Sequence, residues 1–158
     1  MARERGELVI LGMLEEASRG DQIRDEKRKA RDLRINRGEE FLKTAESLIE
    51  KFGTEMERVD GKRFWQTPSV EVFDGARTVH ICLAKYVTFG TNISSKCFAI
   101  VADTHDQRLF CIEQYFVPSL RKPQRGMFIY HLGFVATDKE IMKGLQAIKF
   151  IEKKLNSR

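Results

Sequence analysis

An alternation of side chains between residues 78 and 87 places the strongest constraint on the fold. Val79, Ile81, Leu83 and Val87 alternate there with Thr78, His80, Cys82, Ala84 and Tyr86. Successive side chains of a β-strand point to opposite faces, so a period of two predicts a strand that buries one face. A chain built around such a strand needs partner strands beside it and a layer that covers the buried face.

Further strand-like runs surround this one. Residues 70–72 precede the turn sequence FDGA, and the polar residues 103–107 separate the apolar runs 96–102 and 108–116 as the link of a hairpin would. A last apolar run covers residues 126–135. The pattern predicts an antiparallel sheet of about five strands.

Helical spacing appears before and after the strand-like region. Residues 4–18 form an apolar-rich short helix in this interpretation, with Gly20 placed to end it and Asp21 placed to begin the next. Residues 21–37 predict a solvated, strongly charged helix, and residues 41–52 an amphipathic helix that Gly53 ends.

A capping box marks the start of a C-terminal helix. Thr137 and Glu140 match the pattern in which each side chain accepts a hydrogen bond from the other residue's backbone N–H. The apolar residues Ile141, Leu145, Ile148 and Leu155 then follow along one face. Helices, an antiparallel sheet and a final helix together predict an α+β fold, with the C-terminal helix packed on a curved sheet.

The amino-acid composition is typical of a globular chain with a polar appendage. Of 158 residues, 42% are hydrophobic and 32% are charged, so the chain can bury a core without metal or disulfide bonds. We expect two parts, a basic N-terminal helical segment (1–53) and a core of sheet and C-terminal helix (54–158).

Positive charge is concentrated in residues 19–37. This segment holds eight arginine or lysine residues against four acids, which leaves four of the five net positive charges of the chain. Such a balance favours an anionic partner. The alternative is a solvated helix whose acids pair with its bases one turn away, as Asp25 would pair with Lys29.

The three cysteines, Cys82, Cys97 and Cys111, are odd in number, form no CxxC pair and lie in apolar runs. They are interpreted as reduced core residues, which indicates an intracellular protein. No signal-peptide pattern and no apolar run of about 20 residues is present, so we expect a soluble protein of the cytoplasm without a membrane partner.

Catalytic patterns are weak. His80, His105 and His131 lack the spacing of a metal site, and no glycine-rich phosphate loop or nucleophile elbow is found. Asp103, His105 and Asp106 could serve a small nuclease or other hydrolase, but the same residues suit a hairpin turn. We expect no enzyme activity, no metal, no cofactor and no small-molecule substrate.

Basic and aromatic residues occur side by side in three stretches, 62–66, 83–90 and 121–130. Single strands are held by positive side chains along the phosphates and by aromatic rings on which bases stack. The candidate nucleic-acid-binding residues are Arg24, Lys27, Arg28, Lys29, Arg31, Arg34, Lys62, Arg63, Trp65, Lys85, Tyr86, Arg121, Lys122, Arg125 and Tyr130. The loop that holds Arg121, Lys122 and Arg125 could instead bind a small anion or be a solvated turn.

Aromatic residues at period two also have a purely structural interpretation, because they pack well in a core. Phe128, Tyr130 and Phe134 share one face of the predicted last strand, and we place Phe128 and Phe134 in the core. Tyr86 and Tyr130, with polar tips, are the better surface candidates, and Trp65 fits either place.

Two stretches resemble a known family. VEVFDGARTVHICLAKY (70–86) resembles the opening hairpin of the single-strand-binding transcriptional coactivators of the positive-cofactor type and their Whirly relatives. KPQRGMFIYHLGFVATDKEIMKGLQAIKFIEKKL (122–155) resembles the basic turn, apolar strand and closing helix of the same family. The chain departs from the pattern in its N-terminal helical segment and its longer middle strands. It is also similar to Whirly-like RNA-binding proteins associated with the nucleus-like compartment of jumbo phages.

The resemblance implies a curved antiparallel sheet backed by a helix, oligomerisation, and basic and aromatic side chains that grip single strands. It carries over to Lys85 and Tyr86 at a strand end and to Lys122 and Arg125 in a turn. The leading hypothesis is therefore a non-enzymatic homo-oligomer that binds single-stranded RNA, or less preferably DNA, with little sequence specificity. The alternatives are a protein-interaction module that docks on an acidic protein, such as a viral factor, and the small hydrolase.

Overall fold

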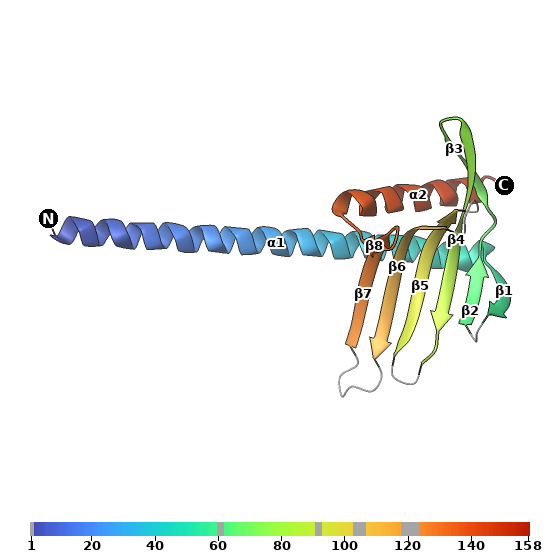
Figure 1. Ribbon diagram of the computed structural model, residues 1–158, viewed down its shortest axis with the longest axis horizontal. Helices are drawn as coiled ribbons and strands as arrows, with labels where there is room; N and C mark the ends of the chain where they lie inside the picture. Colours follow the sequence, from blue (N-terminus) through green and yellow to red (C-terminus); the bar gives the residue numbers. More distant parts are fainter. Residues whose placement is uncertain (1, 60–61, 91–92, 103–106, 118–123) are drawn as a thin grey trace. The chain divides into compact units, whose positions relative to one another are not determined.

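The computed structural model describes residues 2–59, 62–90, 93–102, 107–117 and 124–158 (Figure 1). They form two helices and eight strands: α1 (Ala2–Phe52), β1 (Thr54–Val59), β2 (Lys62–Gln66), β3 (Val70–Asp74), β4 (Arg77–Thr88), β5 (Ser94–Ala102), β6 (Gln107–Val117), β7 (Gln124–His131), β8 (Phe134–Val135) and α2 (Asp138–Asn156). The chain divides into two compact units, Met1–Asn36 and Arg37–Arg158, so the boundary falls inside α1. The fold is α+β, as predicted.

All the strands belong to one antiparallel sheet in the order β1-β2-β4-β5-β6-β7-β8. β3 is off this path, because β2 and β3 pair with different stretches of β4, around Ala84–Val87 and Arg77–Ile81 respectively. The expectation of about five strands is corrected to eight. The short β1 and β2 lack a clear apolar alternation, and β8 has two residues.

A tight turn divides the apolar run 126–135 into two strands. Leu132 and Gly133 both have positive φ, 50° and 86°, which suits the two-residue turns that join antiparallel strands. The chain therefore reverses after His131, and Phe134 pairs with His131 in place of continuing the strand. The expectation that 126–135 forms a single strand is wrong.

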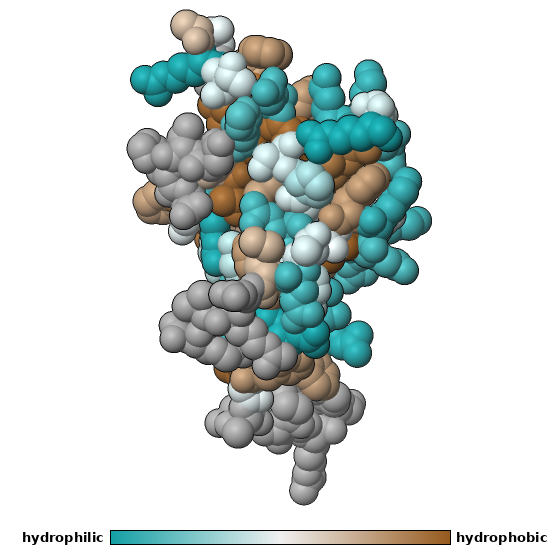
Figure 2. Space-filling view, turned by 90° about the vertical axis from the view of Figure 1, so that its right-hand side faces the viewer, coloured by the Kyte–Doolittle hydropathy of each residue, from teal (hydrophilic) through white to brown (hydrophobic). Residues whose placement is uncertain are grey.

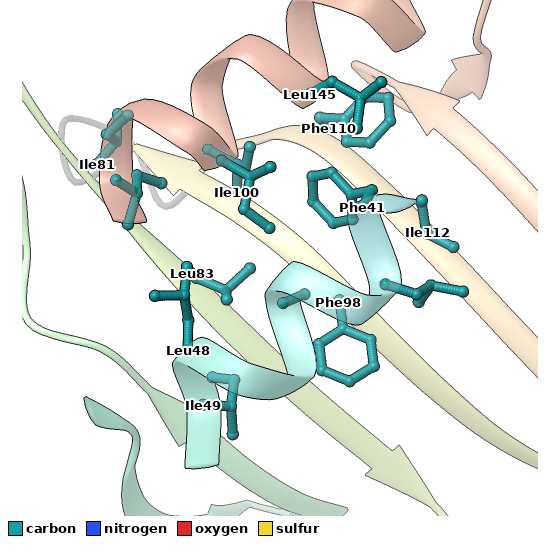
Figure 3. Close-up of a cluster of buried hydrophobic side chains, with 14 of the residues drawn as sticks. Phe41, Leu48, Ile49, Ile81, Leu83, Phe98, Ile100, Phe110, Ile112 and Leu145 are labelled. Atoms are coloured by element: carbon teal, nitrogen blue, oxygen red, sulfur yellow. The ribbon is translucent and has the colours of Figure 1, made fainter. Parts of the chain in front are cut away.

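The main core lies between the sheet and both helices (Figure 3). Phe41 from α1 and Leu145 from α2 belong to it, and the Phe41 and Phe110 rings meet at 4.9 Å. The strands contribute alternate residues, among them Ile81, Leu83, Phe98, Ile100, Phe110, Ile112 and Ile129. The strand predicted for residues 78–87 and its core face are thereby confirmed, since Ile81 and Leu83 are buried under the helices. The opposite face is also buried at Cys82 and Ala84, which the prediction of a strand buried on one face did not include.

α1 continues through both Gly20 and Gly38. The expectation that Gly20 ends a first helix is wrong, because a glycine inside a helix costs only about 1 kcal/mol relative to alanine. Gly38 has a packing role: a Cβ there would lie 2.9 Å from Met127 Cε and 3.1 Å from Ile129 Cδ1. A residue without a side chain therefore lets α1 approach β7 closely. Gly53 does follow the last helical residue, as predicted, and its N–H donates to Ile49 O at 2.9 Å.

α2 confirms the predicted capping box. The Thr137 N–H donates to Glu140 Oε2 at 2.7 Å, and the Glu140 N–H donates to Thr137 Oγ1 at 3.4 Å. Ile141, Leu145 and Ile148 are buried on the core side of this helix. Each such side chain contributes about 1.5–3 kcal/mol by leaving water. In the described part of the chain, neither helix has a stretch apolar and long enough to cross a bilayer.

Candidate nucleic-acid interface

Alternate residues of the sheet point away from both helices. Ile81 and Leu83 of β4 enter the main core, so Cys82, Ala84 and Tyr86 point to the other side. A second, smaller cluster lies there, and no described residue of α1 or α2 belongs to it. We call this side the open face and define it by Phe64, Tyr86, Cys97, Ala99, Arg108, Cys111, Glu113, Tyr115, Phe128 and Tyr130.

One aromatic group of the open face is built on β2 and β4. Phe64 and Tyr86 are paired across the two strands, and their rings stack at 4.7 Å between centroids with 28° between planes. The Arg108 guanidinium from β6 lies 4.5 Å from the Tyr86 ring centroid. Arg108 itself is exposed, so Tyr86 carries a positive, planar group that solvent reaches.

A second aromatic group is built on β6 and β7. The Tyr115 and Phe128 rings stack at 5.1 Å, and Phe128 and Tyr130 follow at 6.0 Å. Tyr115 lies over Gly126, where a Cβ would overlap its ring. Phe128 is 47% exposed, so this row of rings offers a large aromatic surface to solvent.

Small side chains separate the two aromatic groups. Cys97, Ala99 and Cys111 are buried, and Tyr86, Val101 and Tyr130 pack against them. Across the sheet, Tyr86 pairs with Cys97, which pairs with Glu113, which pairs with Phe128. With about 4.8 Å between strands, Tyr86 and Phe128, one from each aromatic group, are about 14 Å apart across the sheet.

The charge of the open face is mixed. Arg108 supplies a positive group, and Glu113 supplies a carboxylate between the two aromatic groups. Burial raises the pKa of Tyr86, an effect that Arg108 opposes in part, and burial also raises the pKa of Tyr130. Both phenols are therefore neutral at ordinary pH, which keeps their rings suited to stacking.

Trp65 and Lys85 lie on the other side of the sheet, toward the helices. Lys85 Nζ is 4.9 Å from the Trp65 ring centroid and 5.8 Å from that of Phe98, a residue of the main core. Burial lowers the pKa of Lys85, and Lys96 adds to this effect. Arg63 also lies over Trp65, at 4.8 Å. Lys85 and Tyr86 are neighbours in sequence but point to opposite faces.

The remaining basic candidates are dispersed. Arg24, Lys27, Lys29 and Arg31 are exposed on α1 in the unit Met1–Asn36, and Arg34 is partly exposed there. Asp25 contacts Arg28 at 3.2 Å, which replaces the expected pair with Lys29.

Lys62 is exposed at the start of β2, and its position in the strand places it on the same side as Phe64. Arg125 is exposed on β7, 5.7 Å from the Phe116 ring centroid. Arg121 and Lys122, like the hydrolase candidates Asp103, His105 and Asp106, lie outside the described residues.

The aromatic residues differ from expectation in two places. Phe128 is 47% exposed and Phe134 is 78% exposed, so neither belongs to the core. The reversal at residues 132–133 also removes Phe134 from the face of Phe128 and Tyr130, because Phe134 pairs with His131.

Phe64, Arg108, Tyr115 and Phe128 were missed as members of the site. Alternation within each strand could have grouped Phe64 with Gln66 or Tyr115 with Glu113. The register between neighbouring strands, which brings Arg108 over Tyr86, cannot be predicted from a repeating pattern in the sequence.

A pocket of about 310 Å³ lies at the ends of β4, β5, β6 and β7. Val87, Phe89, Tyr115, Phe116 and Gly126 line it, together with the cationic residues Lys96 and Arg125 and the polar residues Ser94, Ser95 and Gln114.

Among the described residues, no group of histidine, cysteine and acidic side chains could hold a metal ion. Figure 2 shows hydrophobic side chains that reach the surface between hydrophilic ones on one side of the molecule.

Comparison of the chain with models of protein families, with curated proteins and with solved structures finds no match.

Proposed function

We propose that this protein binds single-stranded nucleic acid on the open face, without catalysis and with RNA preferred over DNA. The observation that carries the proposal is the pair of aromatic groups, Phe64 with Tyr86 and the row of Tyr115, Phe128 and Tyr130, on a sheet face whose small core cluster includes no described residue of α1 or α2. Stacking of a base on an aromatic ring contributes about 1–3 kcal/mol and requires no particular base.

The two groups act as separate stacking sites. Their separation of about 14 Å corresponds to about four nucleotides at the 3.4 Å rise of a stacked strand, and to fewer when the strand is extended. A strand laid across β4 to β7 therefore reaches both groups. At Tyr86, the base stacks on the Arg108 guanidinium, which already lies on the ring at 4.5 Å.

Phosphates are neutralised by cations outside the aromatic rows. Lys62 lies on the open face, and the exposed basic residues of α1 add sequence-independent attraction. Glu113 disfavours phosphate near the centre of the face, so the bases turn toward the aromatic rings and the phosphates turn toward solvent. Such contacts read no base edge strongly, which leaves sequence specificity low.

The Whirly-like assignment and a homo-oligomeric state are part of the same proposal. An antiparallel sheet followed by a closing helix agrees with them in outline. The eight strands and the long α1 go beyond what the resemblance implies.

Equilibrium binding of labelled oligonucleotides tests the proposed function. Fluorescence anisotropy is measured with single-stranded RNA, single-stranded DNA and a duplex of the same sequence, each at several salt concentrations. Contact with about six phosphates gives a slope near −4 of log affinity against log salt, at about 0.7 per phosphate. We expect single strands to bind more tightly than the duplex, because a duplex does not expose its base faces.

Equal affinity for single strands and duplex, or a slope near zero, would contradict the proposal. Labelled oligonucleotide that stays intact on long incubation with added metal is the result expected of a protein without nuclease activity.

A further inference from the structure

Cys97 and Cys111 form a close pair of free thiols on the open face. They lie on the neighbouring strands β5 and β6, and their sulfur atoms are 2.7 Å apart. A disulfide bond is about 2.05 Å long, so a closure of less than about 1 Å joins the two sulfurs. Cys97 is 8% exposed and Cys111 is 7% exposed, and the cover over them consists of side chains of the sheet itself, Tyr86, Val101 and Tyr130.

We propose that Cys97 and Cys111 are a redox site, at which a small peroxide converts the two thiols into a reversible disulfide between β5 and β6. The inference does not depend on the proposed function, because it rests on the two sulfurs and their surroundings alone. It assigns a modification site to two residues of the open face to which the proposed function gives no part in base stacking or phosphate binding.

The reaction balances with hydrogen peroxide as the oxidant. The Cys97 thiolate attacks one peroxide oxygen, the O–O bond breaks, and the leaving hydroxide takes a proton to become water, which leaves Cys97 as a sulfenic acid. The Cys111 sulfur then attacks the Cys97 sulfur and displaces the hydroxyl group, which leaves as water with the Cys111 proton. Two thiols lose two hydrogens and two electrons, and one peroxide becomes two waters.

The surroundings favour Cys97 as the first nucleophile. Either thiol can donate the hydrogen bond between the two sulfurs. When Cys97 ionises, Cys111 is the donor, and this bond lowers the pKa of Cys97 and raises the pKa of Cys111. The Arg108 guanidinium lowers the pKa of Cys97 further, while burial and the Glu113 carboxylate oppose this. The near-complete cover over both sulfurs restricts attack to a small oxidant.

The register of the strands favours a reversible bond. Cys97 pairs with Glu113, and Ala99 pairs with Cys111, so the two cysteines are diagonal and not directly opposite. Diagonal positions are farther apart than directly opposed ones, and a bond across them holds the strands under strain. A strained disulfide is more easily reduced.

Cys82 provides an internal comparison. It is also buried on the same side of β4, where its sulfur accepts a hydrogen bond from Gln66 Nε2 at 3.0 Å. Its partner residue on β5 is Val101, four residues from Cys97, which is about 13 Å along a strand. Cys82 therefore has no route to a disulfide within the folded chain.

The test is oxidation of the folded, full-length protein with a small excess of hydrogen peroxide. We expect a mass loss of about 2 Da, from removal of two thiol hydrogens, in the monomer. Alkylation under denaturing conditions should then label Cys82 alone, and peptide mapping without reductant should join the Cys97 and Cys111 peptides. Dithiothreitol should restore all three thiols.

Two variants sharpen the result. Cys82→Ser should form the disulfide as the parent chain does. Cys111→Ser should stop at the sulfenic acid of Cys97, which dimedone traps when it is added together with denaturant after the peroxide treatment. If Cys111→Ser fails to fold, peptide mapping of the parent chain and of Cys82→Ser still shows whether Cys97 and Cys111 form the disulfide.

Three outcomes would overturn the proposal: persistence of both thiols after peroxide treatment, a disulfide that includes Cys82, and cross-linking only between chains. The oligonucleotide titration of the preceding subsection is unaffected by these outcomes. The two experiments can therefore refute the redox site without refuting nucleic-acid binding, and the reverse.

Discussion

At the scale of single residues, Tyr86 combines more interactions than any other side chain of the candidate interface described above. Its ring stacks on Phe64, lies 4.5 Å from the Arg108 guanidinium and packs on the Cys97–Cys111 cluster. It thereby joins β2, β4, β5 and β6 on one face. Its removal should affect ligand binding more than the loss of one exposed ring normally would.

Replacing Tyr86 or Tyr130 by leucine tests the stacking sites. Leucine retains apolar volume but offers no aromatic face, either to a base at Tyr130 or to the Arg108 guanidinium that presents the stacking surface at Tyr86. Each change should therefore weaken single-strand binding by about 5- to 150-fold, from about 1–3 kcal/mol per stacked base. Phe134→Leu is the matched control, because Phe134 is 78% exposed but pairs with His131, away from the open face. Anisotropy titration, with thermal unfolding to verify the fold, measures the effect. Equal losses in all three variants would argue against a specific aromatic surface.

Glu113 should oppose binding, because its carboxylate lies between the two aromatic groups. We expect Glu113→Gln to raise single-strand affinity by up to about fivefold, for about 1 kcal/mol or less of relieved repulsion. Glu39→Gln removes the same charge from an exposed position on α1 and separates the local effect from net charge. Weaker binding by Glu113→Gln would instead show that the carboxylate contacts the ligand favourably.

At the scale of secondary-structure elements, α2 is held at its first turn by a complete capping box. Thr137 Oγ1 accepts from the Glu140 N–H, and Glu140 Oε2 accepts from the Thr137 N–H. The same helix places Ile141, Leu145 and Ile148 in the core. Loss of the capping box therefore lowers the stability of the packing between α2 and the sheet.

Thr137→Ala should lower the free energy of unfolding by about 1 kcal/mol, which denaturant titration measures. Glu140 adds a pH dependence, because the Thr137 N–H holds its pKa below the ordinary value. A carboxyl whose pKa is lower in the folded state stabilises the fold above its ordinary pKa and loses this effect as pH falls through the folded value. Glu140→Gln should flatten that acid limb, whereas Glu50→Gln, at an exposed position of α1, should leave it unchanged.

The elements could be predicted where local chemistry defines them. The capping box and the apolar alternation of residues 78–87 each specify a local geometry, and both were confirmed. The expectation that Gly20 ends a helix is wrong, because one glycine costs a helix only about 1 kcal/mol relative to alanine. Sequence also places Lys85 and Tyr86 on opposite faces, but which face the helices cover depends on tertiary packing.

At the scale of the whole molecule, the two units differ in what stabilises them. The unit Arg37–Arg158 contains the core shared by α1, α2 and the sheet, whereas Met1–Asn36 is a single helical segment. Most helical stability in proteins comes from packing of an apolar face. The first unit, whose described side chains are mostly exposed, should therefore contribute little to the stability of the second.

A chain that begins at Arg37 tests this division. We expect a thermal midpoint within a few degrees of that of the full chain, because the core from Phe41 onward is retained. Single-strand binding should persist with a shallower salt slope, since the basic residues of the first unit are lost. Circular dichroism and anisotropy measure the two effects. A large fall in the midpoint would show that the first unit packs on the second.

The continuity of α1 across the unit boundary affects how the basic segment becomes ordered. Starting a helix is unfavourable, whereas adding a residue to an existing one is close to neutral. The turns around Phe41 and Ala45, fixed by the core, serve as a template from which the helix grows backward toward the N-terminus. Amide hydrogens should accordingly exchange faster with increasing distance from residue 37. A ligand that contacts the basic residues would slow that exchange and lengthen the ordered helix without any change in the sheet.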